Sequence, residues 1–62
     1  MLRKGDLVKW CPQTGLGGQV LGVVLENQKQ DSKRVLVHFL GDRKPVRELI
    51  KWVQLVSRGS QG

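Results

Sequence analysis

The 62-residue chain contains 11 Lys or Arg, five Asp or Glu, one cysteine and one histidine, and its formal net charge is +6 at neutral pH. A chain this short forms one domain with a small core. One copy can form neither a disulfide nor the four Cys or His ligands of a structural zinc site. The excess of cations favours a negatively charged partner such as nucleic acid, although it also keeps a small protein soluble.

The first predicted strand lies within KGDLVKW, residues 4–10. Alternation places Val8 and Trp10 on one face of this strand and Leu7 and Lys9 on the other. We therefore expect an N-terminal strand with one apolar face.

A loop and a second strand follow. Residues 11–18 contain one proline and three glycines, and they are predicted to form a long loop. Residues 19–27 alternate as a strand, in which Gly22 indicates a sharp bend or a close backbone approach. The polar residues 28–33 are expected to connect this strand to the next as a hairpin.

The third predicted strand is RVLVHFL, residues 34–40, and its alternation places Val35, Val37 and Phe39 in the core. His38 then lies on the opposite face between two leucines. No nucleophile or orienting carboxylate is spaced to make it a catalytic base, so we interpret it as a strand residue.

The last third of the chain admits two interpretations. Its apolar spacing, with Pro45 at a first helical position, fits an amphipathic helix over about 45–56. We favour a short strand at about 45–50, a tight turn near 51–54 and a final strand that ends near Ser57. The preceding GDRK is spaced as a hairpin turn, and β-branched residues favour strands.

Together these elements predict an all-β fold, a small five-stranded barrel with one short 3-10 turn before the last strand. Residues 1–57 form this single domain, and the polar, glycine-rich residues 58–62 are expected to be a flexible tail. The single cysteine and the absence of a long apolar run or a leader-like N-terminus predict a cytoplasmic protein.

The pattern resembles the SH3-like barrel group, which includes KOW and Tudor-type modules, over residues 4–57. The resemblance lies in KGDLVKW, GQVLGVVLE, RVLVHFLGD and LIKWVQLVS. The order is also similar to small barrel proteins encoded by tailed phages, in which a GDLV-W start and a VLVHF strand recur. A phage relationship would place the protein in the host cytoplasm or in the virion.

The resemblance implies a binding module. KOW-type members bind RNA or ribosomal and polymerase partners, Tudor-type members bind modified side chains in aromatic cages, and other members are adaptors or virion subunits. This chain departs from the Tudor pattern, because its only aromatic residues are Trp10, Phe39 and Trp52. Fold alone does not give function.

No group of residues indicates catalysis. Cys11 is interpreted as an inert, half-buried thiol. The segment GLGGQV at 15–20 lacks the last glycine of a dinucleotide-binding loop and the Gly-Lys-Ser/Thr of a P-loop. The five acidic residues are scattered along the chain. We therefore expect a protein that is not an enzyme and that uses no cofactor or metal.

The basic residues form the candidate binding site. Four cations fall within residues 43–51, where Glu48 is the only acid, and further cations precede or lie on the first strand. An exposed tryptophan beside them would offer a surface on which bases stack. A solvated basic face without a partner is the alternative. The candidate residues are Arg3, Lys9, Trp10, Arg43, Lys44, Arg47, Lys51 and Trp52.

Two functions fit these features. The first is a nucleic-acid-binding module that contacts the phosphate backbone. The alternative is a protein-interaction adaptor or a small structural subunit of a larger assembly such as a phage particle, with an acidic protein surface or a second copy as its partner. Neither a membrane nor a small-molecule substrate is expected. In the alternative, Leu7, Leu36, Leu40 and Leu49 would dock against the partner.

Overall fold

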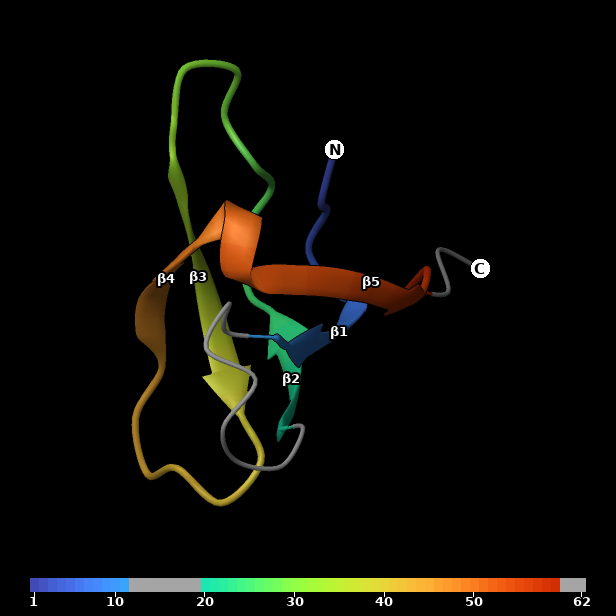
Figure 1. Ribbon diagram of the computed structural model, residues 1–62, viewed down its shortest axis with the longest axis vertical. Coiled ribbons are helices and arrows are strands. Elements are labelled where there is room, and N and C mark those ends of the chain that lie inside the picture. Colours follow the sequence, from blue (N-terminus) through green and yellow to red (C-terminus); the bar gives the residue numbers. More distant parts are fainter. Residues whose placement is uncertain (12–19, 60–62) are drawn as a thin grey trace.

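The computed structural model describes residues 1–11 and 20–59, which form one antiparallel sheet in the order β4-β3-β2-β1-β5 (Figure 1). Within these residues the all-β prediction is confirmed, including the 3-10 turn before the last strand. The loop predicted at 11–18 lies, apart from Cys11, outside them. The elements are β1 (Leu7–Trp10), β2 (Val20–Val24), β3 (Arg34–Phe39), β4 (Val46–Leu49), the 3-10 turn η1 (Ile50–Trp52) and β5 (Val53–Ser57).

The helix considered for residues 45–56 is wrong. β4 pairs with β3, and β5 pairs with β1, so only η1 remains between them. This turn begins one residue before the expected 51–54. Ile50 and Val53 pack against the core from the turn and from the strand that follows it. The helix-like spacing therefore comes from two short strands joined by a 3-10 turn.

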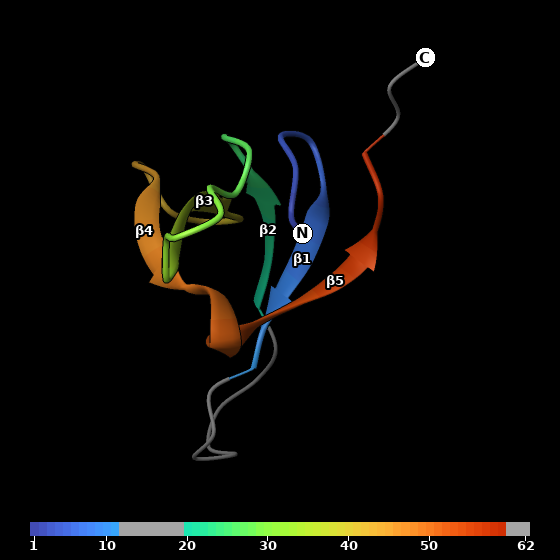
Figure 2. The ribbon, with the colours of Figure 1, turned by 90° about the horizontal axis from the view of Figure 1, so that it is seen from above.

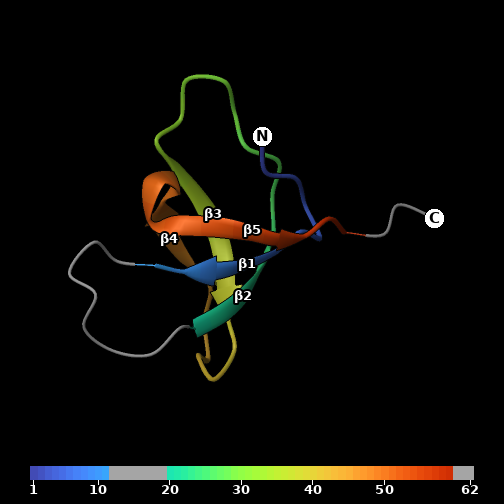
Figure 3. The ribbon, with the colours of Figure 1, turned by 45° about the vertical axis from the view of Figure 1, so that its right-hand side comes forward.

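The sheet is curled, and β5 pairs with β1 at one edge of it. In Figure 2 the strands follow one another from β4 to β5, and in Figure 3 β5 and β1 run side by side at an angle to β3. The register between β1 and β5 shifts between Leu7 and Val8. Such an irregularity increases local twist, which helps the sheet to bend around its inner face.

The inner face carries the core. Val35, Val37 and Phe39 are 1%, 0% and 6% exposed, so the predicted core face of β3 is confirmed. Val8 and Val24 bring matching side chains from β1 and β2, and both are fully buried. Burial of an aliphatic or aromatic side chain of this size contributes about 1.5–3 kcal/mol. Trp10, Val20, Ile50 and Val53 pack around this cluster, which also includes Leu2.

The outer face of the sheet is partly apolar. Leu7, Leu36 and Leu49 are half-buried there, and Leu40, just after β3, is 65% exposed. On β4, Val46 lies opposite the core residue Val37 but stays 40% exposed. As the cross-strand partner of Val37 it lies on the inner face, but the small core does not cover it.

The β3–β4 turn is fastened by His38. Its Nε2 donates a hydrogen bond to the carbonyl oxygen of Asp42 at 2.8 Å, and the N–H of Asp42 donates to the Phe39 carbonyl at 3.1 Å. Gly41 adopts a φ of 94°, which residues with a Cβ rarely adopt. His38 therefore lies on a strand, as predicted, and its hydrogen bond to the turn was not foreseen from the sequence.

The two ends of the curled sheet hold different segments (Figure 1). At one end, the chain before β1 lies against the β2–β3 connection through the Gln28 N–H, which donates to the Leu2 carbonyl at 2.9 Å. η1 joins the same end, since the Ile50 N–H donates to the Lys33 carbonyl at 2.9 Å. The opposite end holds the β3–β4 turn.

Candidate functional site

The basic stretch predicted at residues 43–51 is divided between these two ends. Arg43 and Lys44 are exposed in the β3–β4 turn, whereas Lys51 is exposed in η1 at the other end. Arg47 lies between them on β4, and its guanidinium is 2.7 Å from the Glu26 carboxylate. The four cations therefore follow β4 from end to end and do not meet at one point.

The other predicted residues are also separated. Lys9 lies on the outer face of β1, opposite Leu21 of β2. Trp10 packs against the core, and Trp52 is half-buried in η1. In the described part of the chain both indole Nε1 atoms are buried without a hydrogen-bond partner. Arg3 is exposed in the segment before β1.

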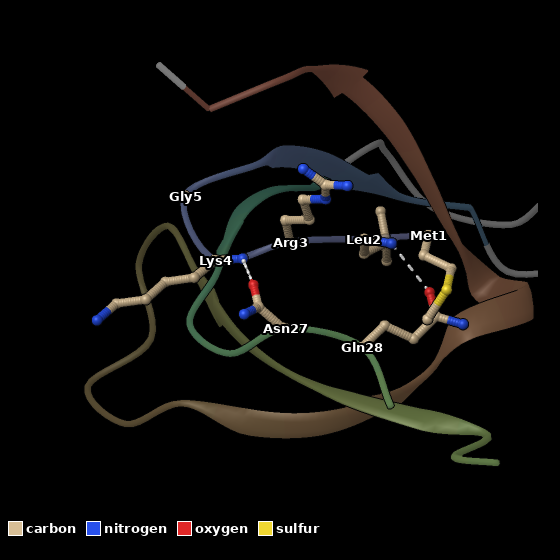
Figure 4. A pocket seen from close by; sticks show the side chains of 7 residues that line it. All are labelled: Met1, Leu2, Arg3, Lys4, Gly5, Asn27 and Gln28. Atoms are coloured by element: carbon tan, nitrogen blue, oxygen red, sulfur yellow. Dashed lines mark hydrogen bonds between the residues drawn. The ribbon is translucent and has the colours of Figure 1, made fainter. Parts of the chain in front are cut away.

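Three adjoining hollows occupy the end that holds η1. The first, of about 800 Å³, lies between residues 1–5 and the side chains of Asn27 and Gln28 (Figure 4). The second, of about 490 Å³, shares Gln28, and the third, of about 370 Å³, shares Lys33 with the second. We call this surface the basic end, after its five cationic side chains, Arg3, Lys4, Lys33, Arg34 and Lys51.

No described carboxylate lines the basic end. The hollow at the opposite end differs. It measures about 250 Å³, and the described residues around it include the carboxylates of Asp42 and Glu48 but no cation. The linings of the hollows at the two ends therefore differ in charge, although the opposite end also carries the exposed Arg43 and Lys44 in the β3–β4 turn. A negatively charged ligand is attracted to the hollows of the basic end more than to the hollow at the opposite end.

Three cations of the basic end, Lys33, Arg34 and Lys51, form no ion pair with the described residues. In residues 1–11 and 20–59 the ion pairs are Arg47 with Glu26 and Arg58 with Asp6. Lys33, Arg34 and Lys51 take part in neither, so their charge at the basic end is not compensated by a contact within the described chain. Uncompensated cations that share a concave surface add their potentials.

Sequence reasoning missed Lys33 and Arg34. Lys33 ends the polar connection predicted at residues 28–33, and Arg34 is the first residue of β3. The available signal was the basic dipeptide itself. These two residues lie near Lys51 because β3 pairs with β4 and the Ile50 N–H donates to the Lys33 carbonyl. In the sequence, Lys33 and Arg34 are far from Lys51 and do not form a cluster with it.

Asp6 anchors the segment that carries Arg3. Its carboxylate, on a residue only 2% exposed, accepts the Gly59 N–H at 2.8 Å and the Arg3 N–H at 2.9 Å. Hydrogen bonds from these two N–H groups, that of Gly59 first, together with the charge of Arg58 lower the pKa of Asp6. Residues 58 and 59 of the predicted tail thus lie against Asp6, and residues 60–62 are outside the described chain.

The lowered pKa predicts a loss of stability in acid. The ionised carboxylate favours the folded state, so its contribution is fully present above the ordinary pKa of about 3.9 and is lost as the pH falls through the lowered folded-state pKa. We expect the Tm of the wild type to fall more steeply below about pH 5 than that of Asp6→Asn, which cannot titrate there. Thermal unfolding followed by circular dichroism checks this, and equal pH dependence would contradict it.

The described residues contain neither a cluster of metal ligands nor a membrane-spanning helix. Among the described residues, no three His, Cys, Asp or Glu side chains are grouped so that they could hold a metal ion. In the same part of the chain there is no helix with the length and apolar character needed to cross a membrane.

No protein-family model, curated protein or solved structure matches this chain. Its function is therefore inferred from the charges, hollows and hydrogen bonds of the described residues.

Proposed function

We propose that this protein is a non-enzymatic module that binds the phosphate backbone of nucleic acid through its basic end. The observation that carries the proposal is the set of three adjoining hollows with five cationic side chains and no described carboxylate. Cations that neutralise phosphates release condensed counterions, which drives binding and makes it weaken as salt rises. The net charge of +6 adds a general attraction.

The proposed site overlaps only partly with the site expected from the sequence. It keeps Arg3 and Lys51 and adds Lys33 and Arg34. Arg47 is less suited, because the Glu26 carboxylate 2.7 Å away already neutralises it. The cations of the β3–β4 turn attract nucleic acid at longer range without contacting the same phosphates.

We also infer that the fold is an SH3-like barrel. The strand order β4-β3-β2-β1-β5 and the position of η1 before β5 support this inference. It carries no function by itself, since such barrels serve unrelated roles.

Two double variants that remove equal charge test the proposal. Lys33→Ala with Lys51→Ala removes two cations from the basic end, and Arg43→Ala with Lys44→Ala removes two from the β3–β4 turn. We expect the first pair to lower the affinity for a labelled oligonucleotide about tenfold or more, and to reduce the slope of log affinity against log salt by about 1 to 2. The second pair should change the affinity less than about threefold.

Fluorescence anisotropy at about 50 mM and about 200 mM salt measures both effects. Equal weakening by the two pairs would show that net charge matters and position does not. No binding by the wild type at low salt would reject the proposal. That result would favour the second candidate, a protein-interaction module or assembly subunit, which is supported by the exposed Leu40 and the half-buried Leu7 and Leu36 on the outer face.

A further inference from the structure

Two side-chain amides in the first hollow have orientations fixed by the backbone (Figure 4). The Leu2 N–H donates to Gln28 Oε1 at 3.0 Å, and the Lys4 N–H donates to Asn27 Oδ1 at 3.0 Å. The Gln28 N–H donates back to the Leu2 carbonyl at 2.9 Å. Since both amide oxygens accept backbone hydrogens, the NH2 groups of Asn27 and Gln28 are left as hydrogen-bond donors.

The surroundings of these NH2 groups are rich in donors and poor in acceptors. In the described part of the chain neither NH2 group has a hydrogen-bond acceptor. Arg3 lines the same hollow, and no described carboxylate does. The carboxylate of Asp6 is 2% exposed and already accepts the N–H groups of Arg3 and Gly59. Oriented donors beside a cation form the surroundings that an anion requires.

We propose that the hollow between residues 1–5 and the amides of Asn27 and Gln28 is a phosphate-binding site for a nucleic-acid strand. The NH2 groups of Asn27 and Gln28 point away from each other in Figure 4, so each donates to a different phosphate of the strand, and Arg3 supplies positive charge. This inference rests on the proposed function and specifies which side chains hold two phosphates of the backbone. Its volume of about 800 Å³ leaves room for the sugars on either side of a phosphodiester.

Gln28 also lines the neighbouring hollow with Lys33 and Lys51. A strand whose phosphate binds at the amides can therefore continue across Gln28 to these two lysines. The amides fix the position of the strand through hydrogen bonds, and the lysines add charge. Neither contact reads a base, so binding is independent of sequence.

The variant Gln28→Glu separates this site from general charge. It keeps an oxygen that accepts the Leu2 N–H, so the fold should persist, but it replaces the NH2 donor with a carboxylate oxygen. We expect the affinity for oligothymidylate of about 12 nucleotides to fall about tenfold or more. The matched control Gln54→Glu makes the same change on the exposed part of β5, and we expect it to lower the affinity less than about threefold.

Nuclear magnetic resonance of the side-chain NH2 groups gives a second readout, which distinguishes a lost contact from a loss of fold stability. On titration of the wild type with the oligonucleotide, the Asn27 and Gln28 NH2 signals should shift while that of Gln54 stays in place. Inorganic pyrophosphate is titrated in parallel, to distinguish a backbone phosphate from a free one. Asn27→Asp should behave as Gln28→Glu does, because it also keeps the accepting oxygen.

The outcomes separate this inference from the proposed function. Oligonucleotide binding that survives Gln28→Glu, with stationary NH2 signals, overturns the phosphate site and leaves the function standing. Pyrophosphate that shifts these signals while the oligonucleotide does not bind supports the site and overturns the nucleic-acid function. Absence of both responses overturns both.

Discussion

Replacement of Val37 by aspartate is expected to leave the chain unfolded at room temperature. Val37 is 0% exposed and lies between Val24 of β2 and Val46 of β4 in the register of the sheet. An uncompensated carboxylate at such a site costs several kcal/mol. The net stability of a domain with so small a core is about 3–5 kcal/mol after the entropy cost of folding, so the cost of the buried charge removes most or all of it.

Far-UV circular dichroism and the dispersion of amide resonances measure this result. The control is Val56→Asp, which makes the same substitution at a position of β5 that is 49% exposed. This variant should fold and lose about 1 kcal/mol or less. A cooperative unfolding transition of Val37→Asp near that of the wild type would contradict the assignment of Val37 to the core.

The core of β3 could be predicted because burial on one face of a strand imposes a period of two. Val35, Val37 and Phe39 alternate without interruption, and the following Gly41-Asp42 ends the pattern at a turn. The direction of Val46 was predictable for the same reason. Its exposure was not, because the cover over a strand at the edge of the sheet depends on elements distant in sequence.

The candidate site could be predicted only in part, because closeness in sequence is not closeness on a curled sheet. Arg43 and Lys51 appear as one cluster in the sequence, but β4 carries them to opposite ends. Conversely, Lys33 and Lys51 line the same hollow although β3 and β4 separate them along the chain. Neither the composition nor the periodicity of the sequence indicates that Lys33 and Lys51 are neighbours.

The oriented amides were also beyond sequence reasoning. Asn27 and Gln28 appear as ordinary polar residues of a connection, and their role follows from backbone N–H groups that lie before β1. Asp6 holds that segment in place through the Arg3 N–H and links it to Gly59 after β5. The site therefore depends on the Asp6 carboxylate, which holds the segment before β1 and the residue Gly59 after β5 together.

Whether Gly22→Ala stabilises or destabilises the protein shows whether strand propensity or packing dominates at this position. Glycine inside a strand is usually less stable than alanine by about 0.5–1 kcal/mol, so propensity alone predicts that Gly22→Ala stabilises the protein. The structure predicts the opposite. A Cβ at this position would lie 2.7 Å from Val37 Cγ1 and 2.8 Å from Phe39 Cδ1, both atoms of buried side chains. The sequence predicted a bend or a close backbone approach at Gly22, whereas the atoms nearest to such a Cβ belong to side chains.

We therefore expect Gly22→Ala to destabilise the fold by about 1–3 kcal/mol, the usual cost of excess volume in a packed core. Val37 is β-branched and has little freedom to rotate away. A double-mutant cycle with Val37→Ala, which removes the clashing Cγ1, isolates this contact. The double variant should be more stable than the sum of the single effects predicts, by about 0.5–3 kcal/mol. Urea unfolding of the four proteins measures the difference. Additive effects, or a stabilising Gly22→Ala, would show that β2 and β3 do not approach this closely.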